Sequence, residues 1–192
     1  MRWTTVKADV RYCDFSVVAQ NLSVASIIQI VSYASDGPPI VIQRETQLGI
    51  KQHLSMYNVE AGGLLIGKVY SLSSLERNLI AIEITSFVPS RDFDGSAVSL
   101  KMNSSVWSQT SQLIGADELV VGWYHSHPNL GAFFSGTDRA TQRRFFSNAY
   151  NIGLVIDPVR DEEKWFLTGD SVEVVPEKIL RSLPWVGVGK SA

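Results

Sequence analysis

Residues 120–142, VVGWYHSHPNLGAFFSGTDRATQ, hold two of the three histidines of the chain together with a serine and an aspartate. The stretch begins as an apolar run typical of a buried strand and continues through Pro, Asn and Gly, which favour a loop. Ser135 and Asp138 then have the spacing of a helix N-cap and the third residue of that helix. This order predicts a strand, a loop and a helix, with polar side chains gathered between the strand and the helix.

His125 and His127 stand at the end of the predicted strand. Residues i and i+2 of a strand point to the same face, about 6.5 to 7 Å apart along the backbone. Both imidazoles can therefore reach one metal ion at about 2.0 to 2.1 Å. A His-x-His pair also occurs simply where a strand leaves the core. If the loop reverses the chain, Asp138 returns beside the histidines and completes a set of three ligands, which leaves one zinc position open for catalysis.

A hydrolytic metal centre also needs a general base that is not a ligand. Glu60, Glu83 and Glu118 all lie near the ends of predicted strands. Glu83 alternates within a strand and could face solvent, and Glu118 sits in a turn. Glu60 precedes two glycines that permit a close backbone approach. The sequence pattern alone leaves the choice among the three open.

The rest of the chain alternates between helical and strand patterns, which is typical of an α/β fold with one mixed sheet. A seam with Gly and Pro at residues 35–39 separates an extension, residues 1–38, from a main domain, residues 39–175, and residues 176–192 form a tail. Residues 89–102 show no clear period and are predicted to form a long loop. Strands are predicted at 40–43, 62–70, 78–88, 118–127, 151–157 and 164–170, and helices at 45–57, 103–114 and 137–148.

The composition narrows the class of protein. A net charge of −2 gives no basic field for a phosphate backbone, so nucleic acid is not an expected partner. Cys13 is the single cysteine, which excludes an internal disulfide and favours a reducing, cytoplasmic location. No run of about 18 apolar residues occurs, so neither a membrane span nor a signal peptide is expected. We therefore expect one soluble globular domain.

Two other patterns of zinc hydrolases are absent. The nucleotide deaminases combine His-x-Glu with Pro-Cys-x-x-Cys, and one cysteine cannot supply that set. Helical metalloproteases carry His-Glu-x-x-His, whereas His53 is followed by Leu54 and Ser55. His53 is therefore expected at a helix surface or in packing.

The segments EAGGLLIG, GWYHSHP, SGTD and TQ, with VIDP after the last helix, resemble the JAMM or MPN-plus metalloprotease family. The resemblance covers residues 40–158 and extends to the deubiquitinating subunit of the proteasome lid and the deneddylating subunit of the signalosome. It implies a curved mixed sheet flanked by helices, similar to the cytidine deaminase fold. The small size resembles free-standing prokaryotic members of the family.

The resemblance also implies roles for five residues. His125, His127 and Asp138 would bind one Zn²⁺ per chain. Glu60 would act as general base and acid, and Ser135 would stabilise the oxyanion. The implied reaction is hydrolysis of the amide bond after the C-terminal tail of a ubiquitin-like protein, by deconjugation or by precursor processing.

Other substrates and another class of protein remain open at this point. A peptidase of the same family could process a sulfur-carrier protein or act on phage or cell-wall peptides. A scaffold of the same fold would bind partners without catalysis. Every implied ligand is present in the sequence, which favours an enzyme over a scaffold.

In related enzymes, the substrate tail pairs with the segment that corresponds to residues 90–102. Apolar and polar residues alternate at the end of this segment, with the period of a strand edge that can accept another strand. We expect Val98, Ser99 and Leu100 to hold the tail, with a mobile surface loop as the alternative.

Two parts of the chain depart from the family pattern. Close relatives of the eukaryotic subunits often have Cys-Trp-Leu where this chain has Ala132, Phe133 and Phe134, and residues 1–38 match nothing in the pattern. Phe133 and Phe134 either contact substrate or pack in the core. The expected partners are a ubiquitin-like protein or its conjugate, together with associated activating or conjugating enzymes.

Overall fold

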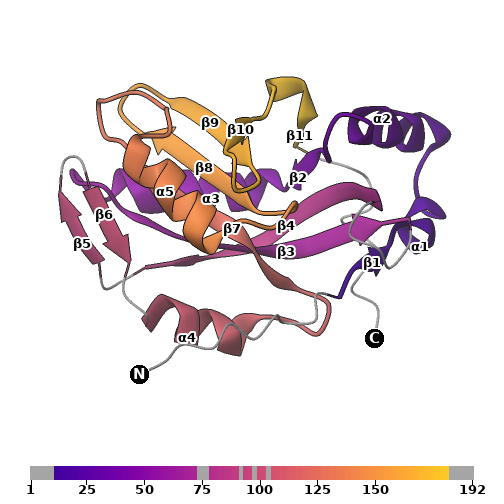
Figure 1. Ribbon diagram of the computed structural model, residues 1–192, viewed down its shortest axis with the longest axis horizontal. Helices are drawn as coiled ribbons and strands as arrows, with labels where there is room; N and C mark the ends of the chain where they lie inside the picture. The colour runs from indigo at the N-terminus through magenta and orange to yellow at the C-terminus, as the bar shows by residue number, and fades with distance from the viewer. Residues whose placement is uncertain (1–10, 73–77, 91–92, 97–98, 103–104, 182–192) are drawn as a thin grey trace.

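The computed structural model describes residues 11–72, 78–90, 93–96, 99–102 and 105–181. One mixed sheet curls into a half-barrel and is flanked by helices (Figure 1). The predicted α/β class with a curved mixed sheet is confirmed.

The strands of the main sheet are β1 Cys13–Asp14, β2 Ile40–Ile42, β3 Gly62–Ser71, β4 Leu79–Pro89, β7 Leu119–Ser126, β8 Ile152–Asp157, β9 Glu162–Leu167, β10 Val172–Glu173 and β11 Ile179–Leu180. Their order is β10-β9-β8-β7-β3-β4-β2-β11, and β1 pairs with β3. The pairs β7 with β8, β2 with β4, β2 with β11 and β1 with β3 are parallel. The other pairs are antiparallel, so the sheet is mixed. In the strand order, β7 lies near the centre of this sheet.

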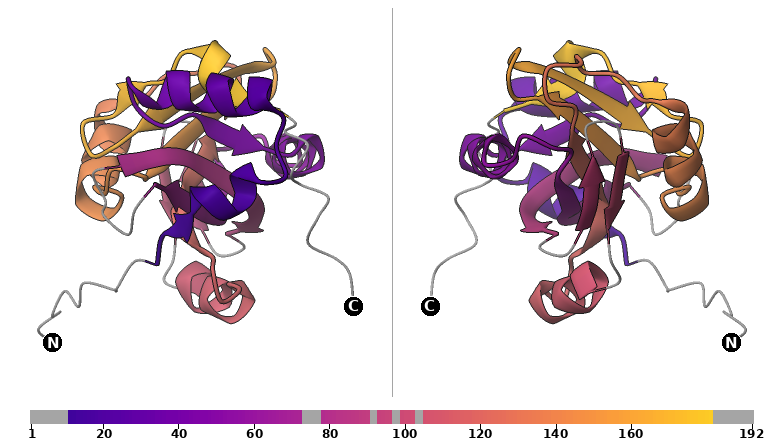
Figure 2. Two further views of the ribbon diagram at one scale, coloured as in Figure 1. Left: turned by 90° about the vertical axis from the view of Figure 1, so that its right-hand side faces the viewer. Right: turned by 90° about the vertical axis from the view of Figure 1, so that its left-hand side faces the viewer.

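The α-helices are α1 Phe15–Ala19, α2 Val24–Ala34, α3 Arg44–Ser55, α4 Ser105–Leu113 and α5 Gly136–Phe145, and a short 3-10 helix spans Pro176–Lys178. Figure 2 shows α3 and α5 on opposite sides of the molecule. Across the described residues, no helix combines the length and apolar content needed to cross a membrane.

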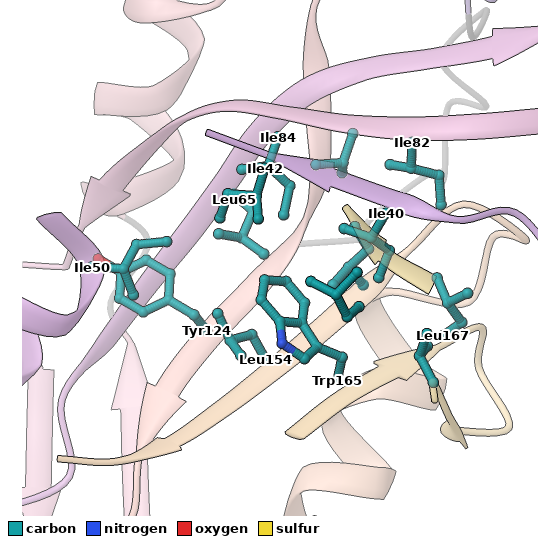
Figure 3. Close-up of a cluster of buried hydrophobic side chains, with 14 of the residues drawn as sticks. Ile40, Ile42, Ile50, Leu65, Ile82, Ile84, Tyr124, Leu154, Trp165 and Leu167 are labelled. Atoms are coloured by element: carbon teal, nitrogen blue, oxygen red, sulfur yellow. The ribbon is translucent and has the colours of Figure 1, made fainter. Parts of the chain in front are cut away.

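Three buried apolar clusters pack on the described sheet, and two of them lie on opposite faces around β7. On the side of α3, one cluster includes Ile50, Tyr124, Leu154 and Trp165 (Figure 3). The cluster on the side of α4 and α5, which we call the α5-side cluster, contains Leu64, Ile66, Val88, Val106, Trp123, Ala132, Phe134, Phe146, Val155 and Phe166. Burying a large apolar side chain stabilises a fold by about 1.5 to 3 kcal/mol, so each cluster fixes its helices to the sheet.

A β-bulge in β7 decides which residues face α5. Gly122 pairs with Leu65 of β3 and Val120 with the next residue of β3, so Val121 is an extra residue without a partner on β3. Val121 and Tyr124 are buried on the α3 side, whereas Trp123 joins the α5-side cluster. Strict alternation would instead have placed Val121 and Trp123 on one face.

The segments on either side of the predicted main domain also contact the sheet. β1 pairs with β3, and Phe15 of α1 and Ile30 of α2 are buried against side chains of β2 and β4. β11 pairs with β2. The domain limits at residues 38 and 175 stay a prediction.

The predicted elements differ from the observed ones by up to three residues at their ends, with one correction. Residues 89–102, expected to form a long loop, contain the antiparallel hairpin of β5 Phe93–Ser96 and β6 Ser99–Met102, in which Ser96 pairs with Ser99. The alternation at the end of the segment covers β6 alone, and a pattern of four residues is too short to predict a hairpin over the whole segment. Ser99 and Leu100 lie in β6, whereas Val98 lies outside the described residues.

Candidate metal centre

The end of β7 brings two histidine rings to the α5 side of the sheet. His125 pairs with β3 and β8, and just beyond the strand the backbone N–H of His127 donates to the carbonyl of Ile156 at 3.0 Å. Both rings are buried, with centroids 4.8 Å apart. They share one face of the strand, as the i, i+2 spacing predicts.

Helix α5 begins with a capping box. Ser135 Oγ accepts the backbone N–H of Asp138 at 3.2 Å, and Asp138 Oδ2 accepts the backbone N–H of Ser135 at 2.7 Å. The prediction of Ser135 as N-cap and Asp138 as the third helical residue is confirmed. The box also holds the Asp138 carboxylate toward the histidines.

Three side chains bring ligand atoms to one place. Nε2 of His125 lies 3.2 Å from Nε2 of His127. Asp138 Oδ1 is 3.2 Å from Nε2 of His125, and Oδ2 is 3.5 Å from Nε2 of His127. A tetrahedral zinc ion with bonds of about 2.0 to 2.1 Å holds its ligand atoms about 3.3 Å apart. These two nitrogens and one carboxylate could therefore hold a metal ion.

The protonation states of this cluster suit a cation. Burial lowers the pKa of His125, although its contact with Asp138 opposes the change, so the ring favours its neutral form. Burial alone would raise the pKa of Asp138, but hydrogen bonds with His125, His127 and Ser135 hold it well below its ordinary value. Neutral imidazole and ionised carboxylate are the forms that bind metals.

Glu60 lies at the edge of the cluster, just before β3. Its buried carboxylate places Oε1 3.5 Å from Nε2 of His127. Ser126 holds the neighbouring Ala61, because Ser126 Oγ accepts the Ala61 N–H at 3.1 Å and the Ser126 N–H donates to the Ala61 carbonyl at 2.9 Å. Burial raises the pKa of Glu60 to about 7, and His127 partly offsets this rise while Asp138 adds to it.

The other two candidate carboxylates have different partners. Glu83 is buried and accepts a hydrogen bond from the Tyr70 hydroxyl at 2.6 Å, so a solvent-facing position is wrong. Glu118 accepts the Thr85 hydroxyl at 2.6 Å and the Gly115 N–H at 3.0 Å. Of the three, Glu60 is the one beside the histidines.

Residues 44–168 match the Prok-JAB family, the prokaryotic homologs of the JAB domain. The chain belongs to this family. The resemblance to JAMM and MPN proteins is thereby confirmed, and the protein is a JAB domain with a potential metal centre at its β7 to α5 connection.

Three curated relatives are similar to parts of this JAB domain. COP9 signalosome complex subunit 5 of Debaryomyces hansenii is 31% identical over 110 residues, which cover 55% of this chain and 22% of the relative. The 26S proteasome non-ATPase regulatory subunit 14 of Dictyostelium discoideum is 32% identical over 108 residues, or 53% of this chain and 32% of the relative. Ubiquitin carboxyl-terminal hydrolase RPN11 of Saccharomyces cerevisiae is 45% identical over 47 residues, or 24% of this chain and 15% of the relative. The matches thus span less than a third of each relative.

A solved structure has the same fold. The solution structure of protein DSY2949 from Desulfitobacterium hafniense has a TM-score of 0.53 at 20% sequence identity, and the match covers 76% of this chain and 95% of that one. At this identity the likeness concerns the fold alone.

In this JAB domain, one buried carboxylate organises the loop between β7 and α5. Asp157, at the end of β8, accepts the backbone N–H of Asn129 at 2.9 Å and of Gly131 at 2.7 Å. Both loop residues have positive φ, 61° and 90°. Burial alone would raise the pKa of Asp157, but these two bonds and two more backbone N–H groups just after β8 lower it. The ionised carboxylate therefore ties the loop to the sheet.

The two phenylalanines of this loop have different surroundings. Phe133 is 45% exposed, and its ring centroid lies 4.8 Å from that of His127. Phe134 is buried in the α5-side cluster and stacks on Phe166 at 3.9 Å. Phe133 is thus at the surface beside His127, one of the possible metal ligands, whereas Phe134 is a core residue.

Three residues that were not predicted to belong to the site contact or organise it, namely Trp123, Gln142 and Asp157. Trp123 stacks on His125, and Gln142 accepts a hydrogen bond from Trp123. Their spacing could have predicted that both lie on the same face as a possible ligand, since Trp123 precedes His125 by two residues on a strand and Gln142 follows Asp138 by one helical turn. Asp157 stands before a proline at a strand end, where side chains often bond to a neighbouring turn.

Proposed function

We propose that this JAB domain is a zinc-dependent peptidase that cleaves the amide bond after the C-terminal tail of a ubiquitin-like protein, by deconjugation or precursor processing. The observation that carries the proposal is the convergence of His125, His127 and Asp138, with the buried carboxylate of Glu60 3.5 Å from one of them. Two nitrogens and one oxygen leave room for a catalytic ligand position.

His125, His127 and Asp138 would hold the zinc ion. When bound, zinc lowers the pKa of a coordinated water molecule and polarises a substrate carbonyl. The rigid capping box and the central position of β7 hold these ligands in a fixed arrangement before substrate arrives.

Glu60 is the proposed general base and acid. Its carboxylate accepts a proton from the attacking water and returns that proton to the leaving amine, which a lysine amine requires because an amide anion is a poor leaving group. Burial raises its pKa to about 7, close to the value at which proton transfer in both directions is efficient near neutral pH.

Ser135 is the proposed donor to the oxyanion. Its oxygen already accepts the Asp138 N–H in the capping box, so its own O–H proton is available for donation. Donors of this kind commonly contribute about 10² to 10³ in rate.

The substrate class is supported by the relatives and by the surface near the site. One relative is named as a ubiquitin carboxyl-terminal hydrolase. The hairpin of β5 and β6 is a separate two-stranded sheet, and its strands could pair with an extended tail. Exposed Phe133 beside His127 would contact the end of that tail. The single cysteine agrees with action in the cytoplasm, where activating and conjugating enzymes of a ubiquitin-like protein would be partners.

The proposal is tested with zinc-loaded protein and three substrates in parallel. These are ubiquitin joined to a fluorescent lysine peptide, a sulfur-carrier fusion and a cell-wall peptide. We expect cleavage of the first, and we expect Glu60→Gln to keep its zinc while losing about 10² to 10⁴ in rate. Cleavage of only the sulfur-carrier fusion or only the cell-wall peptide would show that the protein acts on that class of substrate instead. Zinc-loaded protein that cleaves none of them would favour a binding scaffold.

A further inference from the structure

The ring of His125 lacks the support that usually orients a metal-binding histidine. Such a ligand normally donates its second ring N–H to a carboxylate, carbonyl or water, and this bond fixes the plane of the ring. Nδ1 of His125 is buried and has no hydrogen-bond partner among the described residues. The orientation of this ring must therefore depend on other contacts.

Trp123 supplies a flat contact for that ring. The indole and the imidazole of His125 are stacked, with centroids 4.5 Å apart and planes 7° from parallel. Phe146 stacks on Trp123 as well, at 5.9 Å and 14°. Trp123 is 3% exposed, so it is held within the α5-side cluster.

Gln142 fixes the indole in its own plane. Trp123 Nε1 donates to Gln142 Oε1 at 2.6 Å, and Gln142 Nε2 donates to the carbonyls of Phe146 and Asn151, both at 3.2 Å. The amide has one direction that satisfies a donor on one side and two carbonyls on the other. Gln142 is completely buried, so loss of these bonds cannot be replaced by bulk water.

The geometry of α5 connects this arrangement with the third ligand. Asp138 and Gln142 are one helical turn apart on the same face of α5. Asp138 contacts His125 directly, and Gln142 reaches the same ring through Trp123. Gly153 on β8 leaves room first for the ring of Phe134 and then for the amide, because a Cβ there would clash with Phe134 and lie 3.0 Å from Gln142 Oε1.

We propose that Gln142 and Trp123 are positioning residues of the metal centre, which orient the His125 ring by stacking in place of a hydrogen bond to Nδ1. The inference rests on the proposed zinc site. Neither residue binds the metal. Their contribution is the fixed direction of His125 Nε2 toward the other two ligands.

The experiment measures zinc affinity by competition with a chelator, and the ligand-field spectrum of the Co²⁺-substituted protein. Gln142→Met keeps the length and the helix preference of the side chain but removes every hydrogen bond. We expect zinc binding about 10- to 100-fold weaker and an altered Co²⁺ spectrum. Trp123→Phe keeps a ring over His125 without the Nε1–H group, and we expect a smaller loss in the same direction.

Val106→Ala is the matched control, since Val106 is buried in the same α5-side cluster. It should lower the melting temperature while leaving zinc affinity and the Co²⁺ spectrum unchanged. Folded Gln142→Met and Trp123→Phe proteins that bind zinc as tightly as the parent, with the parent spectrum, would overturn the inference and leave the proposed function intact. A parent protein that takes up no zinc would overturn the metal centre itself, and this inference with it.

Discussion

Ser135 and Asp138 are joined by two reciprocal hydrogen bonds, one from each backbone N–H to the side chain of the other residue. The same Asp138 carboxylate lies 3.2 Å from Nε2 of His125. Asp138 therefore belongs both to the N-terminal cap of helix α5 and to the cluster of possible metal ligands. A change in the cap is therefore expected to alter the position of the Asp138 carboxylate relative to His125 as well.

Ser135→Ala and Ser135→Gly separate capping from catalysis. Both remove the hydroxyl, so we expect both to lower kcat by about 10² to 10³. Alanine at an N-cap costs about 0.5 to 2 kcal/mol of stability, whereas glycine costs only a few tenths. Urea unfolding should therefore distinguish the variants while their kinetics agree. A glycine variant with the parent rate would show that Ser135 only caps the helix.

Loss of a ligand should remove the metal. We expect one zinc per chain in the parent protein, and none in His125→Ala or Asp138→Ala after dialysis against a trace of zinc, as measured by mass spectrometry of the metal. Glu83→Gln is the control and should keep its zinc, because Glu83 is also a buried carboxylate but is hydrogen-bonded to Tyr70 rather than to the histidines. Equal zinc in all four proteins would place the metal elsewhere.

Asp157→Asn should reduce stability in a manner that depends on pH. The pKa of Asp157 is lowered in the folded protein. Its contribution to the free energy of unfolding is therefore fully present above the ordinary pKa of an aspartate and is lost as the pH falls through the lowered value. Hydrogen bonds to a charged group contribute about 1.5 to 3 kcal/mol. We expect a loss of about that size at pH 7, shrinking below about pH 4.

The measurement is urea unfolding at several pH values. Asp170→Asn removes a carboxylate that is exposed, and it should change stability little at any pH. A loss for Asp157→Asn that is the same at pH 7 and at pH 3 would mean that the charge of Asp157 is unimportant.

Ser99→Pro tests the hairpin as the place that holds the substrate tail. Proline removes a backbone donor of β6, whereas Ser99→Ala keeps it. We expect the proline variant to raise KM for the ubiquitin conjugate, with zinc content and cleavage of a short peptide unchanged. If the two variants have the same kinetics on the conjugate, the tail is held elsewhere.

The geometry within each half of the candidate site was predictable because it depends on short-range spacing, whereas the approach of Asp138 to the histidines also depends on the loop between β7 and α5. His125 and His127 are two residues apart on a strand, and the capping box fixes Asp138 relative to Ser135 within one helical turn. Local periodicity is enough to place such residues on one face. The long α/β elements were predictable for the same reason.

Long-range packing could not be read in the same way. Glu60 reaches the cluster because β3 pairs with β7 and Ser126 holds Ala61. The glycines after Glu60 permit this close approach, but they do not specify which strand pairs with β3. The burial of Glu83 depends likewise on Tyr70, a residue of a neighbouring strand. The hairpin of β5 and β6 left only a short alternation of apolar and polar residues in β6, and the pairing of its two strands depends on backbone bonds.

The side of the sheet on which the candidate metal centre lies depends on the pairing of β7 with β3 around Val121. Val121 is one extra residue on β7, and every residue after it faces the side opposite to that which simple alternation would give. Because Val120 and Gly122 pair with consecutive residues of β3, removal of Val121 alone would give regular alternation and leave Trp123 and His125 on the α5 side. An extra residue between Gly122 and His125, taken up as regular strand from Gly122 onward, would instead turn the two histidines toward α3, away from Asp138. The candidate metal centre should therefore tolerate loss of the bulge residue but not a shift of one residue beyond it.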